Sequence, residues 1–485
     1  MRYILDKRYR FRGWYRLPYG IYDTAEHKAK FFSPEIYDLL LKCDAGHDLD
    51  PEHFSEREKR LIAEFEASGM IRRASWLDFL LPEQKYHVYP ARYRENVHWS
   101  VTGLCNLKCR HCFMSAPHAR HGSPSTEELL SIADQLAECG VFNVGITGGE
   151  PLIREDFTEI VKALSAREIR ITALYTNGWL VNGELLDMLE TNRQHPAFQL
   201  SYDGIGRHDF LRGVAGAEKK TTDALKLLRE RDCNVSVSMC LHRENADTLR
   251  ESVRLLADLG VRSMKCGAMM DLGEWTDPEI RELHLTPEEE MDIFERYIPQ
   301  YFKDDAPMSI SLSGVFLYEK GRRDFGSFFH RECPKEKEDL TLACPVLGTA
   351  FYIGADGVVA PCQGMCDCGG FAENLPSLKE KPLREILCES EYVQYCYATV
   401  GDVRRGNTEC GECVNNDRCA GGCRNSALIA GDNYYGEDPG ACRFYKNGGP
   451  ERIRAAAQPA FEAYLKRHPE IDKENRQDPA DISCL

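Results

Sequence analysis

Three cysteines stand close together in the stretch VTGLCNLKCRHCFM, residues 101–114, directly after an apolar, β-prone run. Cys105, Cys109 and Cys112 have the spacing C-x3-C-x2-C. Thiolates bind zinc and iron–sulfur clusters, but a structural site for either usually takes four protein ligands. A set of three is therefore an incomplete zinc knuckle, a chance cluster, or a site that keeps one metal position open for another ligand.

A second set of cysteines follows far along the chain. It has the pattern C-x12-G-x4-C, then C-x2-C-x5-C-x3-C, and then one more cysteine after a gap. Its members are Cys344, Cys362, Cys410, Cys413, Cys419, Cys423 and Cys442, with Gly357 between the first two. The four-cysteine spacing would arise by chance in about one sequence in 600 at this composition. Zinc bound by four thiolates is the physical rival of an iron–sulfur cluster for this set.

Cysteine content and charge limit the function classes. The chain has 21 cysteines among 485 residues, and its basic, aromatic N-terminus has no signal-peptide pattern. No apolar run approaches the roughly 18 residues of a membrane helix. We therefore expect a cytoplasmic protein, in which thiols stay reduced and the clustered cysteines bind metal. A net charge of −16 argues against nucleic acid as a partner. The cysteines between the two sets are expected to be small buried apolar residues: Cys139, Cys233, Cys240 and Cys266.

Residues 91–305 alternate between strand-like and helix-like segments. The expected strands cover 96–103, 141–149, 169–178, 198–204, 233–241 and 261–270, and the expected helices cover 125–140, 154–168, 182–192, 218–232 and 246–260. This alternation predicts right-handed crossovers and a parallel sheet curved into a partial (β/α)6 barrel. Chemistry in such folds collects at the carboxyl ends of the strands. The residues at these ends are Cys105, Gly148, Asn177, Asp203 and Asn245.

The segments on either side of the barrel have different patterns. Residues 1–90 predict three short strands and then two helices, which together resemble a small winged-helix-like α+β module without the dense basic helix of a DNA-binding protein. Residues 306–450 are rich in Gly, Pro and Cys and need clusters or metals as cross-links. Residues 451–485 predict one amphipathic helix and a polar tail.

The order of these motifs resembles that of the radical S-adenosylmethionine (SAM) superfamily. The shared features are C-x3-C-x2-C after the first strand and GGEP, residues 148–151, after the second. The resemblance implies that Cys105, Cys109 and Cys112 bind three irons of a [4Fe-4S] cluster. SAM would bind the fourth iron through its amino and carboxylate groups, and its cleavage would give a 5′-deoxyadenosyl radical. The open metal position is then the place of SAM.

The resemblance also implies which side chains surround SAM. Gly148, Gly149 and Glu150 would hold its amino group, and His111 would lie against its adenine. The further expected contacts are Ser201 and Asp203 near the ribose and Arg212 at the carboxylate. Each has a structural alternative, because a glycine pair also makes a tight turn and an acid is favourable in a first helical turn. Ser, Asp and Arg at strand ends are also common as caps and surface pairs.

The C-terminal cysteines resemble the SPASM domain of radical SAM enzymes that modify peptides. This resemblance implies two auxiliary [4Fe-4S] clusters. Cys410, Cys413, Cys419 and Cys442 would hold one cluster, and Cys344, Cys362 and Cys423 would hold the other. Cys333 is a candidate for the fourth ligand of the latter, as in some relatives. The alternatives are Cys366, Cys368, or an iron left open to a thiolate of the substrate.

These motifs favour a radical SAM oxidoreductase that acts on a ribosomally made precursor peptide (a RiPP). The N-terminal module resembles elements that bind a leader peptide as an added strand. We expect an intrapeptide cross-link with loss of two hydrogens, a Cys thioether of the sactipeptide or ranthipeptide kind in preference to a carbon–carbon bond. A flavodoxin- or ferredoxin-type protein would supply electrons. The alternatives are formylglycine formation like that of anaerobic sulfatase maturases, peptide epimerisation, and a non-enzymatic iron–sulfur or zinc scaffold. The sequence assigns no catalytic base.

Overall fold

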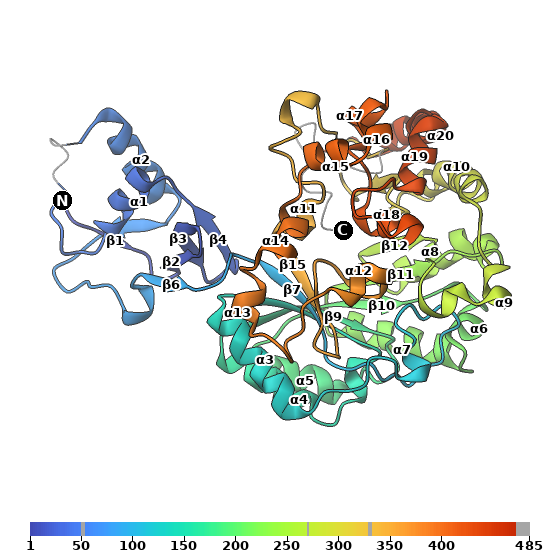
Figure 1. Ribbon diagram of the computed structural model, residues 1–485, viewed down its shortest axis with the longest axis horizontal. Coiled ribbons are helices and arrows are strands. Elements are labelled where there is room, and N and C mark those ends of the chain that lie inside the picture. The colour runs from blue at the N-terminus through green and yellow to red at the C-terminus, as the bar shows by residue number, and fades with distance from the viewer. Residues whose placement is uncertain (50–53, 269–270, 328–331, 472–485) are drawn as a thin grey trace.

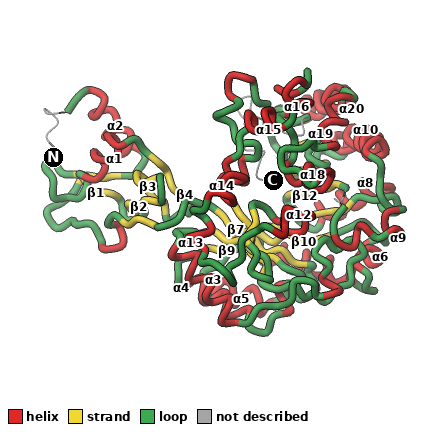
Figure 2. Tube along the Cα trace, viewed as in Figure 1, coloured by secondary structure: helices red, strands yellow, loops and turns green. Residues whose placement is uncertain are grey.

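A computed structural model describes residues 1–49, 54–268, 271–327 and 332–471 of the chain. Figure 1 shows a small N-terminal lobe beside a larger body, in which the helices of the C-terminal region lie next to a curved central sheet. Figure 2 shows the strands of this sheet inside a shell of helices and loops.

The six expected strands and five expected helices of the central region are all present. The strands are β7 (Asn96–Ser100), β8 (Asn143–Thr147), β9 (Arg170–Thr176), β10 (Ala197–Ser201), β11 (Val235–Cys240) and β12 (Ser263–Gly267). The helices are α3 (Thr126–Glu138), α4 (Phe157–Ala166), α5 (Gly183–Thr191), α7 (Ala217–Glu230) and α8 (Leu249–Asp258), with a short extra helix α6 (His208–Arg212). Local signals set the boundaries: Ser125 and Glu128 form a capping box at the start of α3.

The sheet is wider than the six strands that the sequence predicts. Its order is β14-β13-β12-β11-β10-β9-β8-β7-β15-β16. β13 (Ser309–Leu312) pairs in parallel with β12, and β15 (Ala350–Ile353) pairs in parallel with β7. The outer strands β14 (Phe316–Tyr318) and β16 (Val359–Ala360) are antiparallel to their neighbours. The α/β fold with a central parallel sheet is confirmed, and β15 brings the C-terminal cysteine region next to the first barrel strand.

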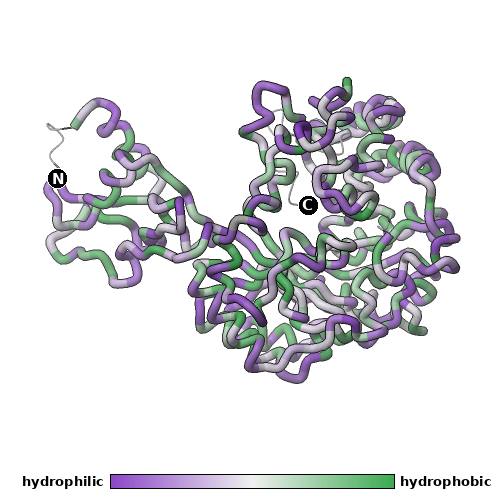
Figure 3. Tube along the Cα trace, in the orientation of Figure 1, coloured by the Kyte–Doolittle hydropathy of each residue, from purple (hydrophilic) through white to green (hydrophobic). Residues whose placement is uncertain are grey.

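Alternating side chains divide the sheet into two faces. Val97, Trp99, Val144 and Ile146 are fully buried and belong to the main apolar core. The residues between them point to the concave side, which is polar along much of β10 to β13. Figure 3 shows hydrophilic residues on the outward turns of the surrounding helices, as amphipathic packing requires.

The N-terminal lobe has more strands than expected. It contains β1 (Tyr3–Leu5), β2 (Tyr9–Trp14), β3 (Leu17–Asp23), β4 (Lys28–Phe31), α1 (Pro34–Leu41), α2 (Glu56–Ala67), β5 (Ile71–Arg73) and β6 (His87–Tyr89). Four strands form a sheet in the order β4-β3-β2-β6, and β1 pairs with β5 in a second, small sheet. The lobe has an apolar core of its own, which includes Phe11, Tyr37 and Leu40.

Specific contacts attach the N-terminal lobe to the barrel. The Arg10 guanidinium donates two hydrogen bonds, of 2.6 and 2.9 Å, to the carboxylate of Glu168. The Asn143 side chain at the start of β8 donates to the carbonyl of His27 at 2.8 Å. The ring of Tyr22 lies 4.7 Å from that of Phe142. The lobe is therefore fixed to the end of the barrel at which the strands begin.

The rest of the chain consists mainly of short helices. Between β12 and β13 lie α9 (Pro278–Arg281) and α10 (Pro287–Lys303), and the latter was not predicted from the sequence. The C-terminal region contains α11 (Pro345–Thr349), α12 (Gly369–Glu373), α13 (Leu383–Ile386), α14 (Ser390–Tyr397), α15 (Val400–Gly406), α16 (Thr408–Glu412), α17 (Asn416–Cys419), α18 (Arg424–Gly431) and α19 (Pro439–Lys446). The predicted C-terminal helix is α20 (Gly449–Arg467), and the predicted tail lies outside the described residues from 472 onward. None of the helices described is long and apolar enough to cross a membrane.

The four cysteines between the two sets behave largely as expected. Cys139, Cys240 and Cys266 are buried in apolar surroundings, whereas Cys233 is half-buried. The prediction of buried apolar residues is thus confirmed for three of them.

Candidate cluster and cofactor sites

The first cysteine loop follows β7, and each of its three sulfurs accepts a hydrogen bond. Leu107 N donates to Cys105 Sγ at 3.4 Å, and Ala116 N donates to Cys112 Sγ at 3.3 Å. Cys109 Sγ receives Nη1 of Arg212 at 3.7 Å. N–H groups directed at sulfur stabilise thiolates and tune iron–sulfur clusters. The donor set therefore fits three cluster-binding thiolates.

Burial also affects the protonation of the first cysteine of this loop. Burial raises the pKa of Cys105 to about 12, with smaller contributions from Glu150 and the other two cysteines. A thiol with such a pKa is protonated at neutral pH unless a positive centre stabilises the thiolate. Nδ2 of Asn177 at the end of β9 also lies 3.9 Å from Cys105 Sγ.

The GGEP segment packs directly against the cysteine loop. Gly149 N donates to the carbonyl of Thr102 at 2.8 Å, and Glu150 N donates to that of Leu104 at 2.9 Å. A Cβ atom on Gly148, which has φ of 151°, would lie 2.5 Å from Thr102 O, and one on Gly149 would clash with Leu104 O. The glycines thus let two backbones meet, and the Gly149 N–H is used within the protein.

Glu150 is completely buried beneath this turn. Its carboxylate accepts hydrogen bonds from the Thr176 hydroxyl at 2.8 Å, Asn177 N at 2.7 Å and Leu152 N at 3.2 Å. Burial raises the pKa of Glu150 to about 7 despite these donors. A cationic group beside it would favour the charged form, so the site suits the amino group that the sequence led us to expect there.

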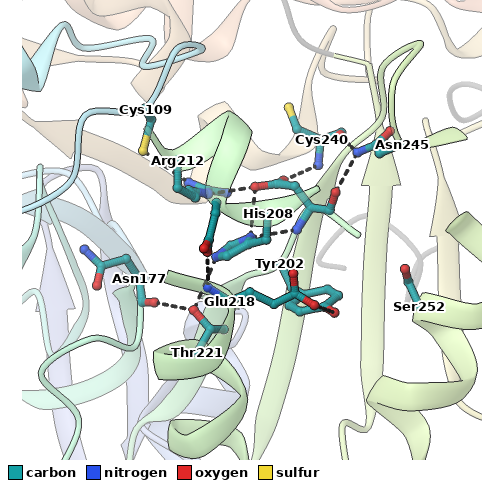
Figure 4. A network of polar contacts seen from close by, with 12 residues as sticks. Cys109, Asn177, Tyr202, His208, Arg212, Glu218, Thr221, Cys240, Asn245 and Ser252 are labelled. Carbon is teal, nitrogen blue, oxygen red and sulfur yellow. Dashed lines mark hydrogen bonds and ion pairs between the residues drawn. The ribbon is translucent and has the colours of Figure 1, made fainter. Parts of the chain in front are cut away.

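Asp203 and Arg212 form a buried ion pair at the ends of β10 and α6. Figure 4 shows Arg212 beside Cys109. Arg212 Nε donates to Asp203 Oδ2 at 2.7 Å, and Cys240 N donates to Asp203 Oδ1 at 3.0 Å. Although burial opposes ionisation of both groups, their pairing holds the pKa of Asp203 far below and that of Arg212 above its ordinary value. Both carboxylate oxygens are therefore engaged within the protein.

Histidine and asparagine side chains complete this network. His208 Nδ1 accepts from Asp203 N at 3.0 Å and its ring stacks on Tyr202, with centroids 5.4 Å apart. Asn245 Nδ2 donates to the carbonyls of Asp203 and Cys240 at 2.9 and 2.7 Å. Asn245, which the sequence places at a strand end, thus fixes the turn after β10 to the turn after β11.

The carboxyl end of α6 holds the cysteine loop from the other side. Lys108 N and Arg110 N donate to the carbonyls of Arg212 and Leu211 at 3.2 and 2.9 Å. Gly213 has φ of 68°, and a Cβ there would clash with Lys108 O. The HDFLRG motif therefore supports the cysteine loop through backbone as well as through Arg212.

His111 lies within this support. Burial, followed by the charge of Arg212, lowers its pKa to about 3, so the ring is neutral. Its Nδ1 is buried and has no hydrogen-bond partner among the described residues, and its ring meets Trp275 edge-on at 6.1 Å. An orphaned acceptor or donor at this depth is compatible with a ligand, although Trp275 occupies one side of the ring.

Ser201 ends β10 on the concave side of the sheet, opposite Ser238 of β11.

Four C-terminal cysteines share one cavity. Cys410, Cys413, Cys419 and Cys442 all line a cavity of about 290 Å³ between α16, α17 and α19. Burial raises the pKa of Cys419 to about 12 and that of Cys442 to about 11. Four thiols around one space are a donor set that fits an iron–sulfur cluster.

The remaining cysteines separate into two groups. Cys344, Cys362 and Cys368 pack in one apolar cluster, and burial together with Cys423 and Cys344 raises the pKa of Cys362. Cys366 also lies within electrostatic reach of Cys362. Cys333 packs instead with Val400 and Ala420, and its N–H donates to the carbonyl of Asp417 at 2.7 Å. Of the three candidates for a fourth ligand, Cys366 and Cys368 share the surroundings of Cys362.

In the described part of the chain, no three His, Cys, Asp or Glu side chains converge closely enough to hold a single ion. A cubane cluster binds each thiolate to a different iron, so its ligands lie further apart than those of one ion.

An ion-pair cluster that no sequence motif predicts joins the two cysteine regions. His121 Nδ1 lies 2.7 Å from Asp356 Oδ2, in the turn between β15 and β16, and Nε2 lies 3.5 Å from Asp367 Oδ2. Hydrogen bonds to these two carboxylates raise the pKa of His121 to about 9. Arg120 also pairs with Asp367 at 3.1 Å. Only the folded structure brings these residues together, because more than 200 positions separate them in the sequence.

Comparison with known proteins agrees with this geometry. The model of the radical SAM superfamily matches residues 99–256, from β7 into α8. The chain contains a radical SAM domain. This match covers the cysteine loop, the GGEP segment and the Asp203–Arg212 pair.

Relatives of the radical SAM domain have several described roles. The antilisterial bacteriocin subtilosin biosynthesis protein AlbA of Bacillus subtilis is 29% identical over 216 residues, which are 43% of this chain and 47% of AlbA. The match thus spans about half the length of AlbA. The AdoMet-dependent heme synthase of Methanosarcina barkeri is 25% identical over 355 residues, 70% of this chain and 94% of that protein.

A solved structure supports the fold over most of the chain. Streptococcus suis SuiB bound to precursor peptide SuiA is 14% identical and has a TM-score of 0.59, with 91% of this chain and 100% of SuiB covered. At this identity the likeness concerns the fold.

Proposed function

We propose that this chain is a radical SAM maturase that forms an intrapeptide cross-link, a Cys thioether, in a ribosomally made precursor peptide. The observation that carries the proposal is the three-cysteine loop, in which every sulfur accepts a hydrogen bond, beside the buried Glu150. A scaffold that only binds peptide has no need of this arrangement of cysteines and Glu150. The biosynthetic role of AlbA and the precursor peptide of SuiB support a peptide as substrate.

The residues of the first site divide into ligands and supports. Cys105, Cys109 and Cys112 would hold a [4Fe-4S] cluster, and Glu150 with the Gly148–Gly149 turn would hold the amino group of SAM. When bound, these groups supply a 5′-deoxyadenosyl radical able to remove hydrogen from carbon. Asp203 orients Arg212, and Arg212 in turn donates to Cys109 and remains the cation available for the carboxylate of SAM. His111 would lie at the adenine side, and Ser201, on the concave face of the sheet, would lie near the ribose.

The C-terminal cysteines would hold two auxiliary clusters. Cys410, Cys413, Cys419 and Cys442 fit one through their shared cavity. Cys344, Cys362 and Cys423 fit the other, for which the surroundings of Cys362 favour Cys366 or Cys368 over Cys333 as a fourth ligand. A flavodoxin- or ferredoxin-type protein would provide electrons. We propose the boundaries 1–90, 91–305, 306–450 and 451–485 for the leader module, the barrel, the SPASM domain and the C-terminal helix with its tail.

The N-terminal lobe offers a place for the leader of the precursor. β4 is an edge strand of its sheet, pairs only with β3 there, and is largely exposed. Phe31 of this strand and Leu17 and Tyr19 of β3 are exposed apolar side chains. A peptide that adds to this edge would gain backbone hydrogen bonds and contacts to alternate side chains. The core of the peptide would remain free to enter the barrel.

A second candidate function is modification of a tetrapyrrole. The observation that favours it is the match to the AdoMet-dependent heme synthase, which covers 94% of that protein. The N-terminal lobe, which has its own core and the edge strand β4, favours a peptide substrate. Binding separates the two candidates: a full-length precursor should bind more weakly when residues 1–90 are deleted, while a tetrapyrrole should bind equally to both forms.

The test of the proposed reaction is mass spectrometry of a cysteine-bearing peptide, encoded beside this gene, after anaerobic turnover in deuterated water. Loss of two hydrogens from an intramolecularly linked peptide is the expected result. Deuterium gain without this loss would show epimerisation, and conversion of a Cys or Ser to an aldehyde would show formylglycine. Either outcome would overturn the cross-link.

A further inference from the structure

The concave face of the sheet carries a field of small polar residues with one cation. Strand pairing places Gln199, Ser236, Ser263 and Ser309 in one row across β10 to β13. The next row, closer to the carboxyl ends, consists of Ser201, Ser238, Lys265 and Ser311. All except Ser201 line a cavity of about 140 Å³, in which Lys265 is the only charged residue. This face is therefore built to receive polar groups.

Lys265 points into this field because of its position on β12. Its neighbours along the strand, Met264 and Cys266, are buried in the core on the helix side, so the side chain between them projects to the concave side. Lys265 is exposed, and no acid forms an ion pair with it among the described residues. Glu290, beside the end of β12, accepts instead from Ala268 N and the Ser313 hydroxyl.

The location of Lys265 relates it to the proposed SAM site. Ser201 and Lys265 belong to the same row and are separated by one strand, so their backbones lie about 10 Å apart. The long side chain of Lys265 can extend into that space and reach a ligand that lies between the two residues. A carboxylate bound at Lys265 would therefore fix a nearby carbon of the substrate close to the ribose side of SAM.

We infer that Lys265, flanked by Ser238 and Ser311, is a specificity residue that binds a carboxylate of the substrate peptide. The carboxylate comes from an Asp or Glu side chain of the core or from the C-terminus of the peptide. The two serine hydroxyls would donate hydrogen bonds to the same carboxylate that accepts from the ammonium group of Lys265. This inference rests on the proposed function, since it names the chemistry of the substrate at that site.

The test measures binding of synthetic heptapeptides to the full chain by NMR. The probes are acetyl-Gly-Ser-Gly-Asp-Gly-Ser-Gly-amide, the same peptide with Asn, and the Asn peptide with a free C-terminal carboxylate. The wild-type chain should bind at least one acidic probe about tenfold more tightly than the neutral one. The Asp probe reports a side-chain source of the carboxylate, and the free-acid probe reports a terminal one.

Variants decide whether the preference comes from Lys265. Lys265→Met should abolish it and Lys265→Arg should retain it, while Lys162→Met, on the exposed face of α4, should leave it unchanged. Equal binding of all probes, absence of binding, or a preference that survives Lys265→Met would overturn the inference. Because no turnover is needed, these outcomes are independent of the proposed reaction, which fails if the precursor gains no intramolecular cross-link.

Discussion

Arg212 connects Asp203 to the sulfur of Cys109: its Nε donates to the carboxylate at 2.7 Å and its Nη1 donates to the sulfur at 3.7 Å. The sequence analysis predicts that Asp203 and Arg212 contact SAM directly. In the structure the two carboxylate oxygens of Asp203 accept hydrogen bonds from Arg212 and from Cys240 N at the end of β11. Asp203 is thus a positioning residue for the first cysteine loop.

Replacing Arg212 by Met should weaken the cluster site. The variant removes a donor to Cys109 Sγ and leaves Asp203 buried without its counter-ion, so we expect about a 10- to 100-fold loss in resistance of the bound iron to a chelator. Iron release followed by absorbance measures this. Arg207→Met on the same segment, which pairs only loosely with Glu244 at 3.8 Å, is the control. Equal loss in both variants would contradict a specific role for Arg212.

A methyl group on Gly149 should destabilise the turn that packs on the cysteine loop. Its Cβ would collide with Leu104 O, which is backbone and cannot rotate away, so Gly149→Ala should cost about 1–3 kcal/mol of stability. The urea midpoint of unfolding reports the change. Gly183→Ala at the start of α5, where a Cβ meets nothing within 4 Å, should leave the midpoint unchanged or raise it. A larger loss at Gly183 than at Gly149 would refute the packing argument.

The contact between His121 and its two carboxylates should make stability depend on pH. Its pKa is about 9 in the folded chain and near 6.5 when unfolded, so the folded state holds the proton more tightly. The contribution is complete below pH 6.5 and is lost as the pH rises through 9; after solvent screening it amounts to about 1–2 kcal/mol. Thermal midpoints of the wild type and His121→Asn between pH 6 and about 9.5 test this. Parallel curves for the two proteins would rule it out.

Loss of the two cysteine sets should have different consequences. Replacing Cys105, Cys109 and Cys112 with Ala should remove about four irons per chain and abolish SAM cleavage. Cys410→Ala should also remove about four irons yet spare part of the cleavage while ending product formation. Iron analysis and chromatography of 5′-deoxyadenosine measure both effects. Zinc in place of iron, or equal loss of cleavage in both variants, would refute this division.

The sequence predicted those parts of the fold that depend on local pattern. Strands β7 to β12 and the helices between them follow from alternation and capping, as at Ser125. β15 was missed because it has four residues and pairs with β7 across more than 250 positions. α10 was missed although Thr286 caps it, and its Pro299 lies within the helix.

The sequence predicted which residues belong to the candidate site better than it predicted the contacts among them. Motif order predicted that Cys105, Glu150 and Arg212 lie near one another, because strand ends of a parallel sheet meet. It did not show that Arg212 serves Cys109, or that Cys333 packs apart from Cys362, since such contacts depend on how distant loops fold together. Lys265 carries no motif at all, and only strand register reveals its surroundings.

The most direct test of the central claim is the amount of 5′-deoxyadenosine formed per cross-linked peptide under single-turnover, anaerobic conditions. The proposed function predicts equimolar amounts for the wild type, and deoxyadenosine without cross-linked peptide for Cys410→Ala. Cross-linked peptide without deoxyadenosine, or neither product from a chain loaded with iron, sulfide and SAM, would contradict it.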